Sequence, residues 1–466
     1  MTFSTIGDHV KLQRGTTYKS ALLDQPGPVL LGLGSIARDG GFRSDKLRTY
    51  GGPSAEKLLV RPGDLYVSLK DVTQSGDLLG AIARVPESVS VGRMTQDTVK
   101  LIFKSDIPKE YFYWLLRTPQ YRQYCRSHAT GTTNLGLSRD DFFGFKIPKL
   151  DAEKRLLIDS LENLEAKIRT NHQINQTLEQ MAHAIFKSWF VDFEPVKAKI
   201  ASLEAGGSEE DALLAAMQAI SGKGEPELTR LQAKQPEQYA ELRATAELFP
   251  AAMQESELGE IPEGWECLAL DQIAKYQNGL ALQKFRPESE DDYLPVVKIA
   301  QLKKGYADHG EKASPNIKPD CIIDNGDVVF SWSGSLMVDT WCGGRAALNQ
   351  HLFKVTSENH PKWLYFHFTR HHLEEFQRIA SDKAVTMGHI KREHLKRAMC
   401  AVPDKSTINS AGKTLENILN KQVELRLERT TLSELRDTLL PKLLSGEISV
   451  SSAEHPQTNA VEEANV

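Results

Sequence analysis

Apolar side chains recur at alternating steps of four and three residues between Leu156 and Phe190, which places them along one side of a helix. The same series returns 254 residues later, between Lys413 and Leu444. Within the two series, the triplet Leu161-Glu162-Asn163 reappears as Leu415-Glu416-Asn417. The pattern therefore predicts two long helices at equivalent positions of an internal repeat.

Each series is apolar at its ends and polar in its middle. A polar pair buried between two helices fixes their register at some cost in stability. The helices could therefore pair antiparallel with their polar middles matched, so that Asn171 and Asn175 face the second helix near Gln422, Leu425 and Arg429. The alternative is two ordinary amphipathic helices packed on separate domains. In the paired arrangement, the contact is lined by Leu161, Leu164, Asn171, Asn175, Leu178, Leu415, Ile418, Gln422, Leu425 and Leu432.

The segments that precede the two helices also resemble each other. Each holds strand-like runs separated by turns, and four short motifs recur in the same order. The repeat predicts two copies of one mixed domain and hence a pseudo-twofold molecule. In the first copy, the opening stretch Ile6–Leu12 has the pattern of a short helix. The corresponding motifs are residues 11–15 with 275–279, 30–33 with 296–299, 62–68 with 325–331 and 146–148 with 401–403.

These patterns predict an α+β fold, in which two similar mixed α/β domains are separated by two long antiparallel helices that form a coiled-coil spacer. The segment between the two copies is acidic and rich in alanine, which is typical of solvated helices joined by a breaker. The expected parts are a first mixed domain (1–149), a central long helix (150–193), a helical connector (194–260), a second mixed domain (261–403), a distal long helix (404–450) and a disordered tail (451–466).

The net charge of −5 is unevenly distributed along the chain. Residues 1–150 hold 21 Lys and Arg against 14 Asp and Glu, residues 151–260 hold 11 against 20, and residues 261–403 hold 18 of each. The mixed domains are therefore basic or neutral, which permits a surface that faces DNA. The five cysteines have no metal or redox spacing, and no apolar run approaches about 18 residues. We expect a cytoplasmic protein with free thiols.

Sequence motifs for catalysis are missing. The chain has no Walker-type loop, nucleophile elbow or His-Glu-x-x-His pattern, and it lacks the Asn/Asp-Pro-Pro-aromatic motif of adenine methyltransferases. We therefore expect the chain itself to be non-catalytic, with no catalytic, cofactor or metal site. An enzyme that modifies or cuts DNA alone is the less favoured hypothesis.

Polar loops follow strands at matching places in the two domains. The loop Ser331–Ser335 mixes small hydrogen-bond donors with a tryptophan, and Lys70–Gln74 occupies the corresponding place in the first copy. Arg, Asn and Gln side chains nearby can form paired hydrogen bonds with guanine or adenine edges. A single surface residue of these types is usually only solvated. The candidate DNA contacts are Lys70, Thr73, Gln74, Arg93, Gln96, Thr132, Thr133, Asn134, Lys298, Trp332, Ser333, Ser335, Arg345, Asn349, Gln350, His389 and Lys391.

Several longer motifs carry a resemblance to a known family. They are Pro62–Leu65 with Asn325–Val328, Ala347–Phe353, Ile185–Phe193, Phe249–Trp265 and Leu439–Ile448. Together they resemble the DNA-specificity subunit of type I restriction-modification systems over nearly the whole chain. The first copy departs from the pattern at the stretch that matches Ala347–Phe353, where it reads Met94–Lys100.

The resemblance implies two target recognition domains that each read half of a split DNA sequence, with helices that set the spacing between the halves. It also implies that the chain binds two methyltransferase subunits, which use S-adenosylmethionine to methylate adenine. Restriction subunits with ATP- and Mg-dependent motor and nuclease activity would join this assembly. An alternative from another class is a coiled-coil scaffold whose two globular domains bind proteins.

Overall fold

The computed structural model describes residues 3–73, 75–132, 134–289, 291–382 and 388–445, and the expected tail lies outside them. The chain divides into two compact units. One comprises the residues up to Arg169 with those from Thr431 onward, and the other comprises Thr170–Thr430. Both long helices therefore contribute a segment to each unit. In the described part of the chain, no helix is both long enough and apolar enough to cross a membrane.

The first unit is built on two small sheets. The larger one is antiparallel, with the order β2 (Val10–Arg14), β9 (Thr98–Phe103), β5 (Leu65–Ser68) and β7 (Ile82–Arg84). The second has the order β3 (Val29–Leu31), β8 (Gly92–Met94) and β4 (Leu59–Val60), and its β3–β8 pair is parallel. Two further strand pairs are β1 (Phe3–Thr5) with β11 (Lys146–Pro148) and β6 (Lys70–Asp71) with β10 (Leu135–Gly136).

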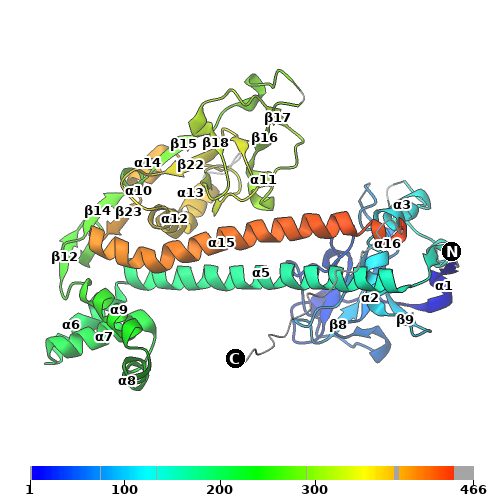
Figure 1. The fold of residues 1–466 in the computed structure, drawn as a ribbon, viewed down its shortest axis with the longest axis horizontal. Coiled ribbons are helices and arrows are strands. Elements are labelled where there is room, and N and C mark those ends of the chain that lie inside the picture. Colours follow the sequence, from blue (N-terminus) through cyan, green and yellow to red (C-terminus); the bar gives the residue numbers. More distant parts are fainter. Residues whose placement is uncertain (1–2, 74, 133, 290, 383–387, 446–466) are drawn as a thin grey trace, which may run out of the picture. The chain divides into compact units, whose positions relative to one another are not determined.

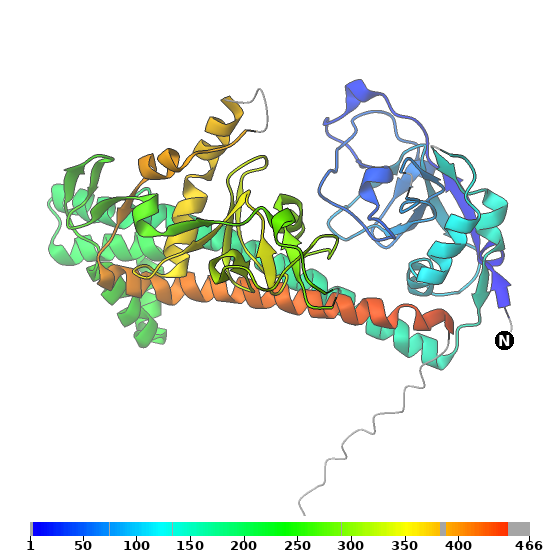
Figure 2. The same cartoon turned by 90° about the horizontal axis from the view of Figure 1, so that it is seen from above.

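Helices of the first unit pack on the larger sheet. Aromatic side chains of α2 (Lys109–Leu115) and α3 (Pro119–Ser127) join the buried core that also contains Leu65, Val67 and Leu101 of the strands. Figure 2 shows these helices in cyan beside the blue strands of the same unit. Two further short helices of this domain are α1 (Ile6–His9) and α4 (Arg139–Gly144).

The expectation of a helix over Ile6–Leu12 is wrong beyond its first turn. The helix ends at His9, and Val10–Arg14 forms strand β2. From Val10 to Gln13, apolar and polar residues alternate with the period of a strand, and β9 supplies the backbone partners. Pairing with a distant strand therefore outweighs the local helical pattern.

The second unit repeats this topology. Its larger sheet has the order β15 (Lys275–Asn278), β22 (Leu352–Thr356), β19 (Val328–Ser331) and β20 (Met337–Thr340). Its smaller sheet has the order β17 (Lys312–Ala313), β16 (Leu294–Val297), β21 (Ala346–Leu348) and β18 (Ile322–Ile323), and its β16–β21 pair is again parallel. Strand β14 (Glu266–Ala269) pairs with β23 (Met399–Val402), as β1 does with β11. The internal repeat of two mixed domains is thereby confirmed.

Helices of the second unit fall into two groups. Those of the mixed domain are α10 (Leu270–Ile273), α11 (Ile299–Lys304), α12 (Lys362–His371), α13 (Leu373–Asp382) and α14 (Arg392–Arg397). The connector forms α6 (Glu194–Glu204), α7 (Glu209–Ser221), α8 (Glu225–Lys234) and α9 (Pro236–Glu247) around a small core of its own, and the hairpin of β12 (Met253–Ser256) and β13 (Gly259–Pro262) follows.

The two long helices are α5 (Ala152–Phe190) and α15 (Lys405–Leu439), the second followed by α16 (Lys442–Ser445). In each unit their segments lie side by side and run in opposite directions (Figure 1). In the first unit Arg436 donates to Glu165 over 3.1 Å, and in the second Asn171 donates to Glu428 over 2.7 Å. The predicted pair of long antiparallel helices is confirmed.

All positions of the two apolar series are buried or half-buried, including their polar middles. Asn171 is 1% exposed, and its Nδ2 reaches Glu428 in the helical turn that also contains Leu425 and Arg429. The Oδ1 atoms of Asn171 and Asn175 are buried without a hydrogen-bond partner among the described residues. This middle segment contributes less to stability than an apolar one would, because unpaired buried polar atoms cost free energy.

Helix α12 attaches the second mixed domain to α5. The His367 ring stacks on the Phe186 ring with centroids 5.1 Å apart, and Phe190 packs near Trp363 at 5.5 Å. Burial lowers the pKa of His367 to about 3, so the ring is neutral at physiological pH and packs as an aromatic group.

Two leucines of α5 provide a test of the helix pairing. Leu161 is fully buried, whereas Leu156 is 55% exposed on the same helix. We expect Leu161→Ala to lower the free energy of unfolding by about 2–5 kcal/mol because it leaves a cavity. The matched control Leu156→Ala should change it by less than about 0.5 kcal/mol. Urea denaturation of the full chain measures both, and equal effects would contradict the assigned helix faces.

Candidate nucleic-acid interface

The same loop follows the central strand of the larger sheet in each domain. In the first domain, the amide of Leu137 donates to the carbonyl of Leu69 over 2.9 Å. In the second, the amide of Ile390 donates to the carbonyl of Trp332 over 3.0 Å. Each loop is therefore fixed to a segment far along the chain, at one end of the sheet. Leu69 and Trp332 are structurally equivalent.

A glycine at the end of the first sheet strand allows a second loop to approach. Gly15 donates to the carbonyl of Thr98 over 3.1 Å, and Gly279 donates to that of Leu352 over 3.0 Å. A Cβ added to Gly15 would lie 2.0 Å from the carbonyl oxygen of Thr95. At Gly279 it would lie 2.2 Å from that of Leu348. No side chain fits at either position, which explains why both copies have glycine there.

Strand pairing sets the register of that second loop. Met94 pairs with Leu31 in the first domain, and Leu348 pairs with Val297 in the second, each across a parallel strand pair. Met94 therefore corresponds to Leu348. The match of Met94 with Ala347 that the sequence motif suggested is wrong by one residue.

The corrected register separates buried from exposed positions of the loop. Thr95 and Asn349 are equivalent and buried, with 6% and 5% exposed. Gln96 and Gln350 are equivalent and exposed. The glutamine is thus the side chain that both domains present to solvent from this loop.

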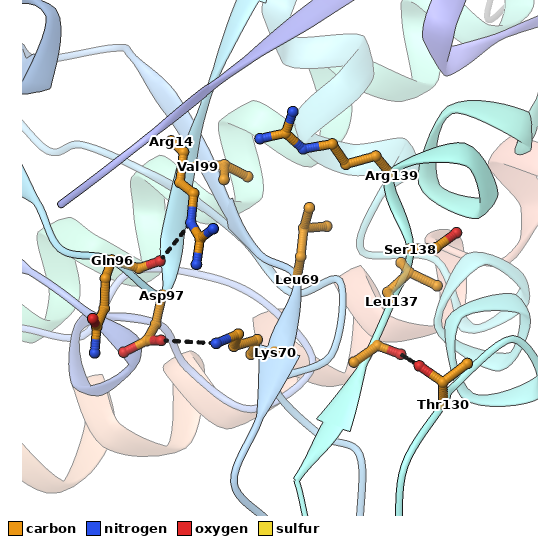
Figure 3. A pocket seen from close by; sticks show the side chains of 11 residues that line it. Arg14, Leu69, Lys70, Gln96, Asp97, Val99, Thr130, Leu137, Ser138 and Arg139 are labelled. Atoms are coloured by element: carbon orange, nitrogen blue, oxygen red, sulfur yellow. Dashed lines mark hydrogen bonds and ion pairs between the residues drawn. The ribbon is translucent and has the colours of Figure 1, made fainter.

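In the first domain these loops line a cavity of about 270 Å³ that is open to solvent (Figure 3). The predicted contacts Lys70 and Gln96 line it together with Arg14, Asp97 and Arg139. Lys70 lies 3.8 Å from Asp97, and Arg14 donates its Nε–H to the Gln96 carbonyl over 3.2 Å.

In the second domain the equivalent surface carries an aromatic cluster. The Trp332 indole donates to the carbonyl of Gln350 over 3.2 Å, and its ring lies 5.8–6.2 Å from those of His351, Phe353 and His389. Arg392 donates to Asn278 Oδ1 over 3.0 Å. This surface therefore offers a ring, an amide and a cation at one end of the sheet.

Comparison with known proteins places the chain in a family. Residues 262–435 match the family model described as the type I restriction modification DNA specificity domain. The HindI type I restriction enzyme specificity subunit of Haemophilus influenzae is 32% identical over 355 residues, which cover 73% of this chain and 77% of that relative. The chain belongs to the family of type I restriction enzyme specificity subunits.

Other relatives are more distant. The MjaIX specificity subunit of Methanocaldococcus jannaschii is 23% identical over 387 residues, which cover 79% of this specificity subunit and 75% of that relative. A crystal structure of a type I restriction-modification S subunit from M. genitalium aligns over 95% of both chains with 13% identity and a TM-score of 0.49.

The other predicted contacts of this specificity subunit are distributed unevenly. Arg93 is 3% exposed in β8, where it donates to Thr16 and Thr17 and lies over the Tyr50 ring. Lys298 forms an ion pair with Glu311. Thr73 donates to Asp71, and Ser333 is buried. Gln74 and Thr133 lie outside the described residues. The predicted contacts that are exposed are Thr132, Asn134, Ser335, Arg345, His389 and Lys391.

Two arginines at equivalent positions were not among the predicted contacts. Arg139 and Arg392 each follow the loop-fixing residue, Leu137 or Ile390, by two positions and begin a short helix. The signal was present in the sequence, because Leu137-Ser-Arg139 and Ile390-Lys-Arg392 align when the two copies are offset by 253 residues. The loops that separate the matching motifs differ too much in sequence between the two copies for a comparison of isolated motifs to reveal this alignment.

The glycine requirement in this specificity subunit can be tested at Gly15. We expect Gly15→Ala to lower the free energy of unfolding by about 1–3 kcal/mol, because the new methyl group displaces the loop that carries Gln96. Gly34→Ala is the matched control, because its Cβ meets nothing within 4 Å. The control should change stability by less than about 0.5 kcal/mol. Thermal and urea denaturation compare the two, and indistinguishable variants would contradict the close approach.

Proposed function

We propose that this chain reads a bipartite DNA sequence, with one half read by each mixed domain. It thereby directs adenine methylation or ATP-dependent cleavage by its partner subunits. Its membership of the specificity-subunit family supports this role. The observation that carries the proposal is the equivalent surface in the two domains, which has one backbone frame and different side chains. A shared backbone arrangement that carries different side chains is suited to the recognition of two different half-sites.

Base reading is assigned to exposed side chains of the two loops. The amides of Gln96 and Gln350 can accept from and donate to the edge of an adenine in the major groove. Lys391 and Lys70 lie on the same surfaces and can hold phosphates, which orients each domain on the duplex. Trp332 offers its ring edge to base or sugar atoms.

The chain contributes recognition and leaves catalysis to its partners. We assign it no cofactor or metal of its own. Two methyltransferase subunits would bring S-adenosylmethionine, and restriction subunits would bring the ATP- and Mg-dependent motor. The complex would act on double-stranded DNA in the cytoplasm.

We assign α5 and α15 the role of a spacer. Helix α5 contains 39 residues, which at about 1.5 Å per residue gives a length of about 58 Å. One turn of duplex is about 34 Å long, so the helix spans between one and two turns. That length suits a split target with a non-specific gap between its halves.

Substitution of each loop glutamine tests the assignment of half-sites. We expect Gln96→Ala and Gln350→Ala to relax base preference in different halves of the methylated motif, by about 1–3 kcal/mol at the affected base. The measurement is methylation mapping of genomic DNA after co-expression with the methyltransferase subunit. Gln123→Ala, an exposed glutamine on α3, is the control and should leave the motif unchanged. The proposal fails if the wild-type complex shows no sequence preference.

Lengthening the helices tests the spacer. Insertion of about one heptad into both α5 and α15 should lengthen the gap between the half-sites and leave their base sequences intact, because the helices carry no base-reading residue. The same methylation mapping reports the gap. Altered half-sites with an unchanged gap would contradict the spacer role.

A further inference from the structure

The cavity of the first domain has an excess of positive charge. Its charged lining residues are Arg14, Lys70, Arg139 and Asp97, so three cations share one acidic group. Asp97 lies 3.8 Å from Lys70, so the carboxylate forms its ion pair with that lysine. The remaining lining residues are neutral: Leu69, Gln96, Val99, Thr130, Gly136, Leu137 and Ser138. Two arginines are left without an acidic partner inside the cavity.

The two guanidinium groups enter this cavity from opposite walls (Figure 3). Arg14 donates its Nε–H to the carbonyl of Gln96 at 3.2 Å, and its two terminal nitrogens have no partner among the described residues. The side chain of Arg139 forms no hydrogen bond or ion pair with another residue in the part of the chain that the structure describes. Two like charges that face one cavity repel each other, and an anion between them reverses that cost.

In the second domain, the side chains at the two equivalent positions bond to each other. Arg392 is equivalent to Arg139, and Asn278 is equivalent to Arg14, because Gly279 and Gly15 follow the latter pair in the matched strands. In the second domain the arginine donates to the Asn278 side chain over 3.0 Å and to the Tyr276 carbonyl over 3.1 Å. In the first domain a second cation replaces that acceptor.

We infer that the cavity between Arg14 and Arg139 binds one phosphate group of the DNA backbone. Guanidinium groups present paired N–H donors that match phosphate oxygens, and two of them can hold one phosphate from two sides. A volume of about 270 Å³ admits a phosphodiester group. This inference rests on the proposed DNA-reading function. It gives the first domain a phosphate contact that the second domain does not make at the equivalent place.

Replacement of single DNA phosphates tests the inference directly. The complex with methyltransferase subunits is titrated with target duplexes in which one linkage at a time is an uncharged methylphosphonate. For the wild type, one linkage beside the half-site of the first domain should weaken binding about tenfold. The double variant Arg14→Asn, Arg139→Gln should bind the unmodified target about tenfold more weakly and lose sensitivity at that linkage only.

The salt dependence of binding supplies a second readout. Loss of one phosphate contact should reduce the slope of log affinity against log salt by about 0.9 in the double variant. Arg61→Gln is the charge-matched control for the single variant Arg139→Gln, because this exposed arginine pairs with Glu56 at the opposite end of β5. It should keep both the slope and the methylphosphonate pattern. Arg139→Gln alone, on an exposed side chain, guards against misfolding of the double variant.

Distinct outcomes separate the possible failures. If wild-type complex binds its target and no linkage is coupled to Arg14 or Arg139, the phosphate site is refuted and the proposed function stands. A change of the methylated motif without a change of salt slope would show that the arginines read bases instead. If the wild-type complex has no sequence preference, the proposed function itself fails.

Discussion

The pairing of α5 with α15 is the interaction on which the rest of the structure depends, because both cores are built around it. In the first unit, Leu157 and Leu161 of α5 belong to the same buried cluster as the sheet residues Leu65 and Leu101. In the second unit, Phe186 of α5 and Leu415 of α15 are part of the cluster that contains β19 and β22. The helices are therefore structural elements of each domain, in addition to the spacer role proposed for them. A change that weakens their packing also removes apolar contacts from a domain core.

The polar middle of the helix pair is a compromise between specificity and stability. Asn171 is buried and uses its amide group on Glu428, while its Oδ1 has no partner among the described residues. An apolar residue at this place would pack better, but it would allow one helix to shift along the other. A buried polar pair makes such shifts unfavourable, because each shift leaves a buried donor or acceptor without a hydrogen-bond partner. One fixed register suits the spacer role proposed for these helices, even at that loss of stability.

One backbone frame with two sets of side chains is an economical way to recognise two half-sites. The glycines at 15 and 279 and the loop-fixing amides at 137 and 390 are the same in both domains, because they define the frame. Other positions of the two surfaces differ, since Leu69 corresponds to Trp332, whereas Gln96 and Gln350 are the same residue. One surface is a charged cavity and the other an aromatic cluster, so the two domains differ in chemistry while they share a fold.

The sequence by itself determined the two long helices, the internal repeat and the family. Helical periodicity and repeated motifs are local properties, so they can be read along the chain. The structure alone decided which residues form each surface. It showed that β2 replaces the end of an expected helix, that Gln96 matches Gln350, and that Arg93 lies buried against Tyr50. It also brought Arg14 and Arg139 into one cavity across 125 positions of sequence. Such contacts depend on strand register between distant segments, and a one-residue change in register exchanges buried and exposed side chains.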